Sequence, residues 1–188
     1  GSIPTQIGWM TEISTLNFSN NLFNSTIPFQ IKKLSNMKEL QLHNNELTGQ
    51  IPDEVEHLTK LEILTLSSNN LDGTLPSTLS ELKNSLRELH VSDNNLTGRM
   101  KNVCPLKELE ILAMDTNGFN GNLLPCVGTM SNLKEFYIFG NDLTGNIPTE
   151  IGNLHNLEKL AIEDNDLTGS IIDTGICALR RDNVLTEF

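Results

Sequence analysis

The stretch Leu40-Gln41-Leu42-His43-Asn44-Asn45-Glu46-Leu47-Thr48-Gly49-Gln50-Ile51-Pro52 is one unit of a pattern that fills this 188-residue chain. Its signature, Leu-x-Leu-x-x-Asn-x-Leu, recurs with small substitutions. The recurring asparagines are Asn21, Asn45, Asn69, Asn94, Asn117, Asn141 and Asn165, at successive spacings of 24, 24, 25, 23, 24 and 24 residues. A fixed period of this length indicates a solenoid, in which each unit buries its apolar side chains only by stacking on its neighbours.

Each part of the unit has a physical role. The alternation in Leu40-Gln41-Leu42 is typical of a short strand with one buried face, and stacking sets such strands side by side in a parallel sheet. The asparagine then turns the chain inward, where its amide both donates to and accepts from backbone groups. We therefore interpret the seven asparagines as a buried ladder that satisfies unpaired backbone, rather than as a ligand site.

The second half of each unit predicts a bend and a short helix. A glycine such as Gly49 stands where a side chain would clash or φ is positive, and the equivalent residues are Gly73, Gly98, Gly121, Gly145 and Gly169. A proline such as Pro52 suits the first turn of a helix, because its missing N–H costs nothing there. Two apolar residues three positions apart, as in Val55 and Leu58, are expected to point inward from the outer side.

The whole unit, Leu-x-x-Leu-x-x-Leu-x-Leu-x-x-Asn-x-Leu-x-Gly-x-Ile-Pro, resembles the plant-specific class of leucine-rich repeats over essentially the entire chain. That class occurs in receptor-like kinases, receptor-like proteins, polygalacturonase inhibitors and many algal proteins. The resemblance implies an α/β-type right-handed superhelix, with a parallel sheet on the concave face and short 3-10 or α-helices on the convex side. It also implies a second short strand after Leu-Thr-Gly. Partner identity does not follow from it, because fold and function separate.

We predict a single leucine-rich repeat domain over residues 1–188, with about seven full repeats and a partial repeat at each end. Solenoids need polar caps, yet residues 1–10 match the second half of a repeat whose strand is missing. Leu185-Thr186-Glu187-Phe188 mimics the opening of a further strand, so we expect a segment of a longer chain. The stretch around Cys177 is similar to the cysteine-containing final repeats of secreted and microalgal members, and its redox state is left open.

The charge balance limits the choice of partners. Acidic residues number 24 and basic residues 13, and the net charge of −11 argues against nucleic acid or an anionic membrane. A basic partner fits better, although the charge can also serve solubility alone. The chain has no run of about 18 apolar residues, so the sequence predicts no transmembrane segment. Four histidines without a Cys-x-x-Cys pair indicate no metal site, and no motif calls for a cofactor.

Cysteines and glycosylation sequons bear on the compartment. Cys104 and Cys126 lie 22 residues apart, close to one repeat, so a disulfide between adjacent coils is sterically reasonable; two free buried thiols are the alternative. Sequons begin at Asn17, Asn24 and Asn95. Asn17 falls on the concave strand, whereas Asn24 and Asn95 are expected in loops and are the better acceptors. Together these features favour an extracellular or secretory location.

Function is expected among the residues that the repeat does not dictate. Side chains between the strand leucines should face solvent on the concave face, where Tyr137 and Phe139 are both predicted to be exposed beside Ile111 and Ala113. Acidic residues flank them at Asp93, Asp115, Glu135, Glu163 and Asp164. An aromatic patch of this kind is typical of a hot spot for a partly basic protein or peptide. The alternatives are that Phe139 replaces a polar residue by drift or packs under a further repeat. The candidate ligand-binding residues are His90, Ile111, Asp115, Tyr137, Phe139 and Glu163.

Catalysis is not predicted. His90 and Asp115 lie on adjacent coils near Ser92, which superficially suggests a triad, but a flat solvated sheet lacks oxyanion donors and water exclusion. The sequence favours a non-catalytic recognition module, receptor-like or secreted, that binds a protein, a peptide or a cell-wall glycan through the concave face. Two alternatives stay open: a structural scaffold subunit of a larger complex, and an inhibitor of a secreted hydrolase.

Overall fold

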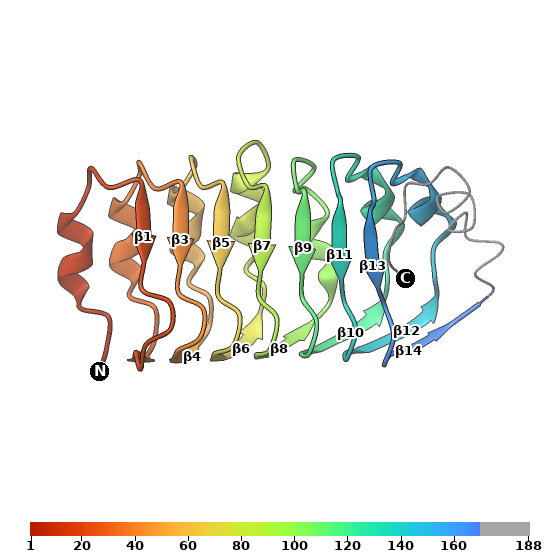
Figure 1. Ribbon diagram of the computed structural model, residues 1–188, viewed down its shortest axis with the longest axis horizontal. Helices are drawn as coiled ribbons and strands as arrows, with labels where there is room; N and C mark the ends of the chain where they lie inside the picture. The colour runs from red at the N-terminus through yellow and green to blue at the C-terminus, as the bar shows by residue number, and fades with distance from the viewer. Residues whose placement is uncertain (170–188) are drawn as a thin grey trace.

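A computed structural model describes residues 1–169 as one stack of coils, in which two parallel sheets and a row of short helices form the sides (Figure 1). The coils follow one another in sequence order from the N-terminal end of the stack. The predictions for Cys177 and for residues 185–188 lie outside the described residues.

The first sheet carries one three-residue strand per coil. All its pairs are parallel and in register, so that Leu40 on the second strand lies between Leu16 and Leu64. These central residues are buried throughout, from Leu16 at 5% exposure to Leu160 at 3%. The strands, in their spatial order, are β1 (Thr15–Asn17), β3 (Glu39–Gln41), β5 (Ile63–Thr65), β7 (Glu88–His90), β9 (Ile111–Ala113), β11 (Glu135–Tyr137) and β13 (Lys159–Ala161).

The second sheet forms the lower side of the stack in Figure 1. Its strands are β2 (Asn24–Ser25), β4 (Glu46–Gly49), β6 (Asn70–Thr74), β8 (Asn95–Gly98), β10 (Gly118–Asn122), β12 (Asp142–Asn146) and β14 (Asp166–Thr168). Each of these strands begins at, or shortly after, the residue that follows the ladder asparagine. It includes most or all of the segment equivalent to Leu-Thr-Gly. The resemblance implied a strand after Leu-Thr-Gly, so the observed strand lies earlier in the repeat. The expectation of loops at Asn24 and Asn95 was therefore wrong. Both residues are exposed, but extended pairing with the neighbouring coils places them on β2 and β8.

The third side consists of short helices, all of the 3-10 type in the described part of the chain. They are η1 (Thr5–Trp9), η2 (Phe29–Lys33), η3 (Asp53–His57), η4 (Ser77–Leu82), η5 (Met100–Val103), η6 (Pro125–Thr129) and η7 (Thr149–Asn153). Pro52 does not lie in the first turn as predicted; it is the N-cap of η3, where its carbonyl accepts from the Val55 N–H at 3.1 Å. Val55 and Leu58 are buried, as the apolar spacing predicts.

The asparagine ladder joins the first sheet to the second. The Asn69 amide donates to the carbonyls of Leu42 and Leu66 at 3.0 and 2.9 Å. Its own carbonyl accepts from the Leu47 N–H at 3.0 Å. Within the described residues, however, only Asn69 and Asn141 are buried; most of the ladder lies half-buried at the corner between the sheets, and Asn21 is exposed and donates only to carbonyls of its own turn.

A column of left-handed residues precedes the ladder and was not predicted. The residue before each ladder asparagine has φ between 52° and 61°, and the column is Asn20, Asn44, Ser68, Asp93, Thr116, Gly140 and Asp164. Asparagine and aspartate tolerate this conformation better than other residues with side chains. The sharp bend lets the chain leave the first sheet and enter the second within a few residues.

Candidate functional site

The outward residues of the first sheet form columns with one residue per coil. Strand register gives the central column as Asn17, Gln41, Thr65, His90, Ala113, Tyr137 and Ala161. The columns thus have the order that the repeat spacing predicts. Figure 1 shows the first sheet, β1 to β13, from the front. In a leucine-rich repeat solenoid this sheet is the concave side, and strand register places Ile111, Ala113 and Tyr137 on it.

Tyr137 lies between two alanines. Parallel pairing sets it beside Ala113 on β9 and Ala161 on β13, and Ala113 is only 7% exposed although it points out of the sheet. Tyr137 and Phe139 are half-buried rather than exposed, which corrects the prediction. Small neighbours leave room for a large ring to lie down against the sheet instead of standing in solvent. We call Ile111, Ala113, Tyr137, Phe139 and Ala161 the aromatic patch.

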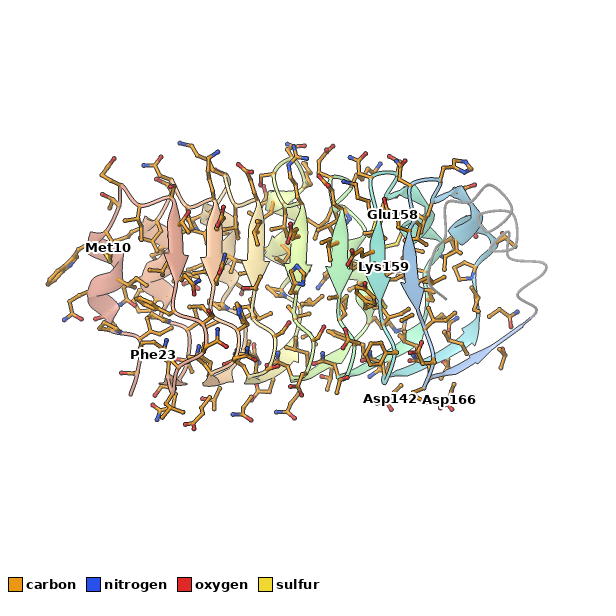
Figure 2. The ribbon with its side chains drawn as sticks, in the orientation of Figure 1. Met10, Phe23, Asp142, Glu158, Lys159 and Asp166 are labelled. Carbon is orange, nitrogen blue, oxygen red and sulfur yellow. A yellow bond between two sulfur atoms is a disulfide. The ribbon has the colours of Figure 1, made fainter. Side chains whose placement is uncertain are left out.

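A polar network fixes the phenol group of Tyr137. Its hydroxyl donates to Glu135 Oε2 at 3.0 Å, and Lys159 Nζ lies 3.2 Å from Glu135 Oε1. Burial and, to a lesser extent, the hydrogen bond to the Glu135 carboxylate raise the pKa of Tyr137 above its ordinary value. Figure 2 shows Lys159 on the front face of β13, with Glu158 at the rim above it. The ring is therefore held in place before any ligand arrives.

Carboxylates border the aromatic patch on the side of the ladder. Asp115 accepts a 2.6 Å hydrogen bond from Ser92 Oγ, and Asp93, Glu163 and Asp164 are exposed. In the described part of the chain, no lysine or arginine forms an ion pair with any of these four carboxylates. Glu135, by contrast, is paired with Lys159. The unpaired carboxylates therefore number four rather than the five that the sequence predicts, and they lie around Phe139.

The residues that superficially suggest a triad do not assemble into one. Ser92 donates directly to Asp115, and His90 Nε2 lies 3.1 Å from Glu88 Oε2 on its own strand. A triad requires the histidine between the serine and the carboxylate. His90 instead lines a 270 Å³ depression together with His43, Asn44, Thr65 and Ser67. Within residues 1–169, no group of three or more His, Cys, Asp or Glu side chains is placed to hold a metal ion.

Cys104 and Cys126 form a disulfide on the helical side. Cys104 is the C-cap of η5 and Cys126 lies in η6, with their Cα atoms 5.5 Å apart. The bond joins adjacent coils, as the sequence analysis considered, and it lies behind the first sheet rather than on the concave face. It therefore stabilises the two coils that carry part of the aromatic patch without contributing a contact to it.

A row of alternating charges runs along the upper rim and was missed. From β3 onward, the charge of the residue before each strand of the first sheet changes sign from coil to coil, in the order Lys38, Glu62, Arg87, Glu110, Lys134 and Glu158. Lys38 bonds Glu62 at 2.9 Å, and Glu110 accepts from both Arg87 and Lys134. Hydrogen bonds from Lys134 and Arg87 lower the pKa of Glu110. The alternation was visible in the sequence once the residues were aligned by repeat.

Comparison with known proteins identifies the family. Sequence models described as leucine-rich repeat match residues 11–71, 85–105 and 132–154. The chain belongs to the leucine-rich repeat family. Its repeats are of the plant type, because the similar solved structures include plant receptor-kinase ectodomains. No curated protein sequence matches the chain.

Three solved structures illustrate the similarity. The plant peptide hormone receptor RGFR1, in complex with RGF2, is 37% identical over 91% of this chain and 27% of that one, with a TM-score of 0.88. The ectodomain of the receptor kinase GASSHO1/SCHENGEN3 from Arabidopsis thaliana, in complex with CASPARIAN STRIP INTEGRITY FACTOR 2, is 31% identical over 100% of this chain and 22% of that one, with a TM-score of 0.91. A plant ice-binding protein is 29% identical over 100% of this chain and 60% of that one, with a TM-score of 0.81.

This leucine-rich repeat chain spans less than a third of the two receptor chains. Among residues 1–169, no helix has the length and apolar character that a membrane crossing requires.

Proposed function

We propose that this leucine-rich repeat domain is a non-catalytic, extracellular recognition module that binds a protein or peptide through the aromatic patch of its concave face. The observation that carries the proposal is the pair Tyr137 and Phe139. Both occupy outward positions where the repeat requires no aromatic side chain, and next to Phe139 lie the carboxylates of Asp115 and Glu163, which form no ion pair within residues 1–169.

The patch has the properties of a binding hot spot. Hot spots are enriched in tyrosine and surround a large side chain with contacts that exclude water. Tyr137 is already held by Glu135, so little rotamer entropy is lost when a partner covers it. The alanines beside it keep the surface low, which gives an apolar side chain of a partner access to the ring.

The charge pattern favours a partner with at least one basic residue near an apolar one. Asp93, Asp115, Glu163 and Asp164 lie on one flank of the aromatic patch, within a chain of net charge −11. A partner lysine or arginine would meet an unneutralised carboxylate there, and the field of the whole chain would speed its approach at low salt. The related receptors give independent support, because RGFR1 is a receptor for a peptide hormone.

The proposal is tested with a random peptide library displayed on phage and the biotinylated domain as bait. Wild type is expected to enrich peptides that combine an aromatic or aliphatic residue with lysine or arginine. Synthetic versions of these peptides should bind the Tyr137→Ala/Phe139→Ala variant at least about tenfold more weakly, since loss of a hot-spot residue costs about 2 kcal/mol or more.

Gln41→Ala provides the matched control, because Gln41 lies on the same face in the same column as Tyr137, four coils away. It should bind the selected peptides as wild type does, and circular dichroism should show all variants folded. Equal affinity of the double variant and wild type would remove the aromatic patch from the proposal. An equal loss in Gln41→Ala would show that the selected peptides bind the sheet without preference for the patch.

A further inference from the structure

A depression of 530 Å³ lies away from the concave face, between the second sheet and the helices. It spans three consecutive coils, where β4, β6 and β8 end and η3, η4 and η5 begin. Its lining residues are Gln50, Ile51, Pro52, Asp53, Thr74, Leu75, Pro76, Ser77, Arg99, Lys101 and Asn102. The proposed function does not use this depression.

One wall of the depression is basic in an otherwise acidic protein. At the positions of Gln50-Ile51-Pro52 and Thr74-Leu75-Pro76 in the two preceding coils, this coil has Arg99-Met100-Lys101. Met100 takes the buried position at 2% exposure, so Arg99 and Lys101 flank it at the surface, where both are exposed. Within residues 1–169, neither cation forms an ion pair. Two free cations at one site favour an anionic group.

Apart from Asp53 and the basic wall, the depression is lined by neutral polar side chains and by the half-buried ring of Pro52. Pro52 follows the buried Ile51 and is half-buried, whereas Pro76 is buried like Leu75 before it, so Pro52 supplies the accessible aliphatic ring. Such a surface suits the C–H face of a pyranose ring. Around it stand hydrogen-bonding side chains from all three coils: Gln50, Thr74, Ser77 and Asn102. Asn102 is fixed by its 2.7 Å hydrogen bond to the Leu75 carbonyl.

The second sheet continues this surface toward the C-terminal coils. A glycine in each coil keeps the sheet low, and the Arg99 stem lies over Gly121, where an added Cβ would be 3.3 Å from Arg99 Cγ. The outward side chains beside these glycines are exposed and uncharged in the coils that follow: Asn120, Asn122, Thr144 and Asn146. Figure 2 shows Asp142 and Asp166 at the lower edge of the sheet.

We propose that this depression is a second binding site, which takes an acidic sugar residue of a glycan chain. The carboxylate or sulfate of the sugar accepts hydrogen bonds from Arg99 and Lys101, and its ring packs on Pro52. Asp53, on the opposite wall, accepts hydrogen bonds from the hydroxyl groups of a neighbouring sugar. A small free anion would use only the two cations, whereas a glycan also uses the Pro52 ring and the neutral polar rim. The site does not depend on the concave-face proposal.

The test measures binding of defined oligosaccharides to the folded chain by isothermal titration calorimetry. Oligogalacturonate supplies carboxylates, a sulfated galactan oligosaccharide supplies sulfates, and their methyl-esterified and unsulfated forms supply neutral references. Wild type is expected to bind one or both acidic forms more tightly than the neutral ones. Arg99→Gln/Lys101→Gln should weaken that binding about tenfold or more, because two charge-assisted contacts are lost.

Lys83→Gln/Lys107→Gln is the matched control, since it removes the same charge from two exposed lysines outside the depression. It should bind as wild type does, and so should Tyr137→Ala/Phe139→Ala, which separates this site from the aromatic patch. Preference for the carboxylate or the sulfate form identifies the acid group. Absence of binding to both acidic forms, equal binding of the neutral forms, or an equal loss in Lys83→Gln/Lys107→Gln would each overturn the proposal.

Discussion

The backbone N–H of Leu47 donates to the side-chain carbonyl of Asn69, one coil further along, at 3.0 Å. The Asn69 amide in turn donates to Leu42 in the earlier coil and to Leu66 in its own. One side chain thus satisfies backbone groups of two coils at the corner where neither sheet can pair them. A buried polar group without a hydrogen-bond partner lowers the stability of the fold. The ladder asparagines that are least exposed should therefore contribute most to the free energy of unfolding.

Asn69→Ala should therefore lower the free energy of unfolding by about 2–4 kcal/mol, because a buried donor and two buried acceptors lose their partners. Urea titration followed by circular dichroism measures it. Asn21→Ala is the control. Asn21 is exposed and donates only within its own turn, so its replacement should cost less than about 1 kcal/mol. Equal losses at the two positions would show that burial does not set the ladder's contribution.

Two glycines with similar backbone angles should respond differently to the same substitution. Gly49 and Gly140 have φ of 73° and 61°, a region that asparagine tolerates. A Cβ at Gly49 would lie 2.9 Å from Thr26 Cγ2, whereas at Gly140 the nearest atom is at 3.6 Å. Gly49→Asn should cost about 1–3 kcal/mol by overpacking, and Gly140→Asn should be nearly neutral.

Thr26→Ser supplies the decisive check on Gly49→Asn, because it removes the methyl group that the new Cβ would meet. Stability of the double variant should recover toward that of Thr26→Ser alone. If thermal unfolding shows no recovery, the requirement for glycine at position 49 comes from the backbone and not from Thr26.

The sequence predicts the solenoid and the order of the concave columns because those features follow from the period alone. Leu40 is buried and Gln41 points outward in any stack with this spacing. The repeat period does not predict which particular side chains contact each other across neighbouring coils. The half-buried state of Tyr137 involves its alanine neighbours at 113 and 161, and the Ser92–Asp115 hydrogen bond depends on which residues the register brings together. The depression at Arg99 arises from three coils at once, so no single repeat predicts it.

Tyr137 is the only tyrosine in the chain, so its ionisation can be followed directly by ultraviolet absorbance. Burial and the Glu135 carboxylate raise its pKa, and the phenol should titrate above its ordinary value of 10.0. Glu135→Gln should lower the pKa only in part, because burial is the larger cause. In urea the titration should return to the ordinary value. A folded-state pKa at or below that value would mean that the ring is not packed against the sheet.

The disulfide between Cys104 and Cys126 should be detectable as a linked pair of peptides in a non-reduced digest. The residues are 22 apart, and a loop of this size gives about 3 kcal/mol of stabilisation. Cys104→Ala/Cys126→Ala should lose about that amount in urea titration, and reductant should then have no further effect through this pair. Alkylation of both cysteines in the unreduced, denatured chain would contradict the bond.

The charged rim makes a pH-dependent contribution whose sign follows from Glu110. Lys134 and Arg87 hold the pKa of this carboxyl below its ordinary value of 4.5, so its ionised form is favoured in the folded state. The resulting stability is present above pH 4.5 and is lost as the pH falls through the lowered folded-state value. Glu110→Gln should destabilise the domain at pH 7 by no more than about 1 kcal/mol, because the rim is partly solvated. The difference from wild type, measured by urea titration from pH 7 down to pH 3, should shrink in acid and in high salt. A difference that stays constant with pH would assign the loss to packing of the Glu110 side chain instead of its charge.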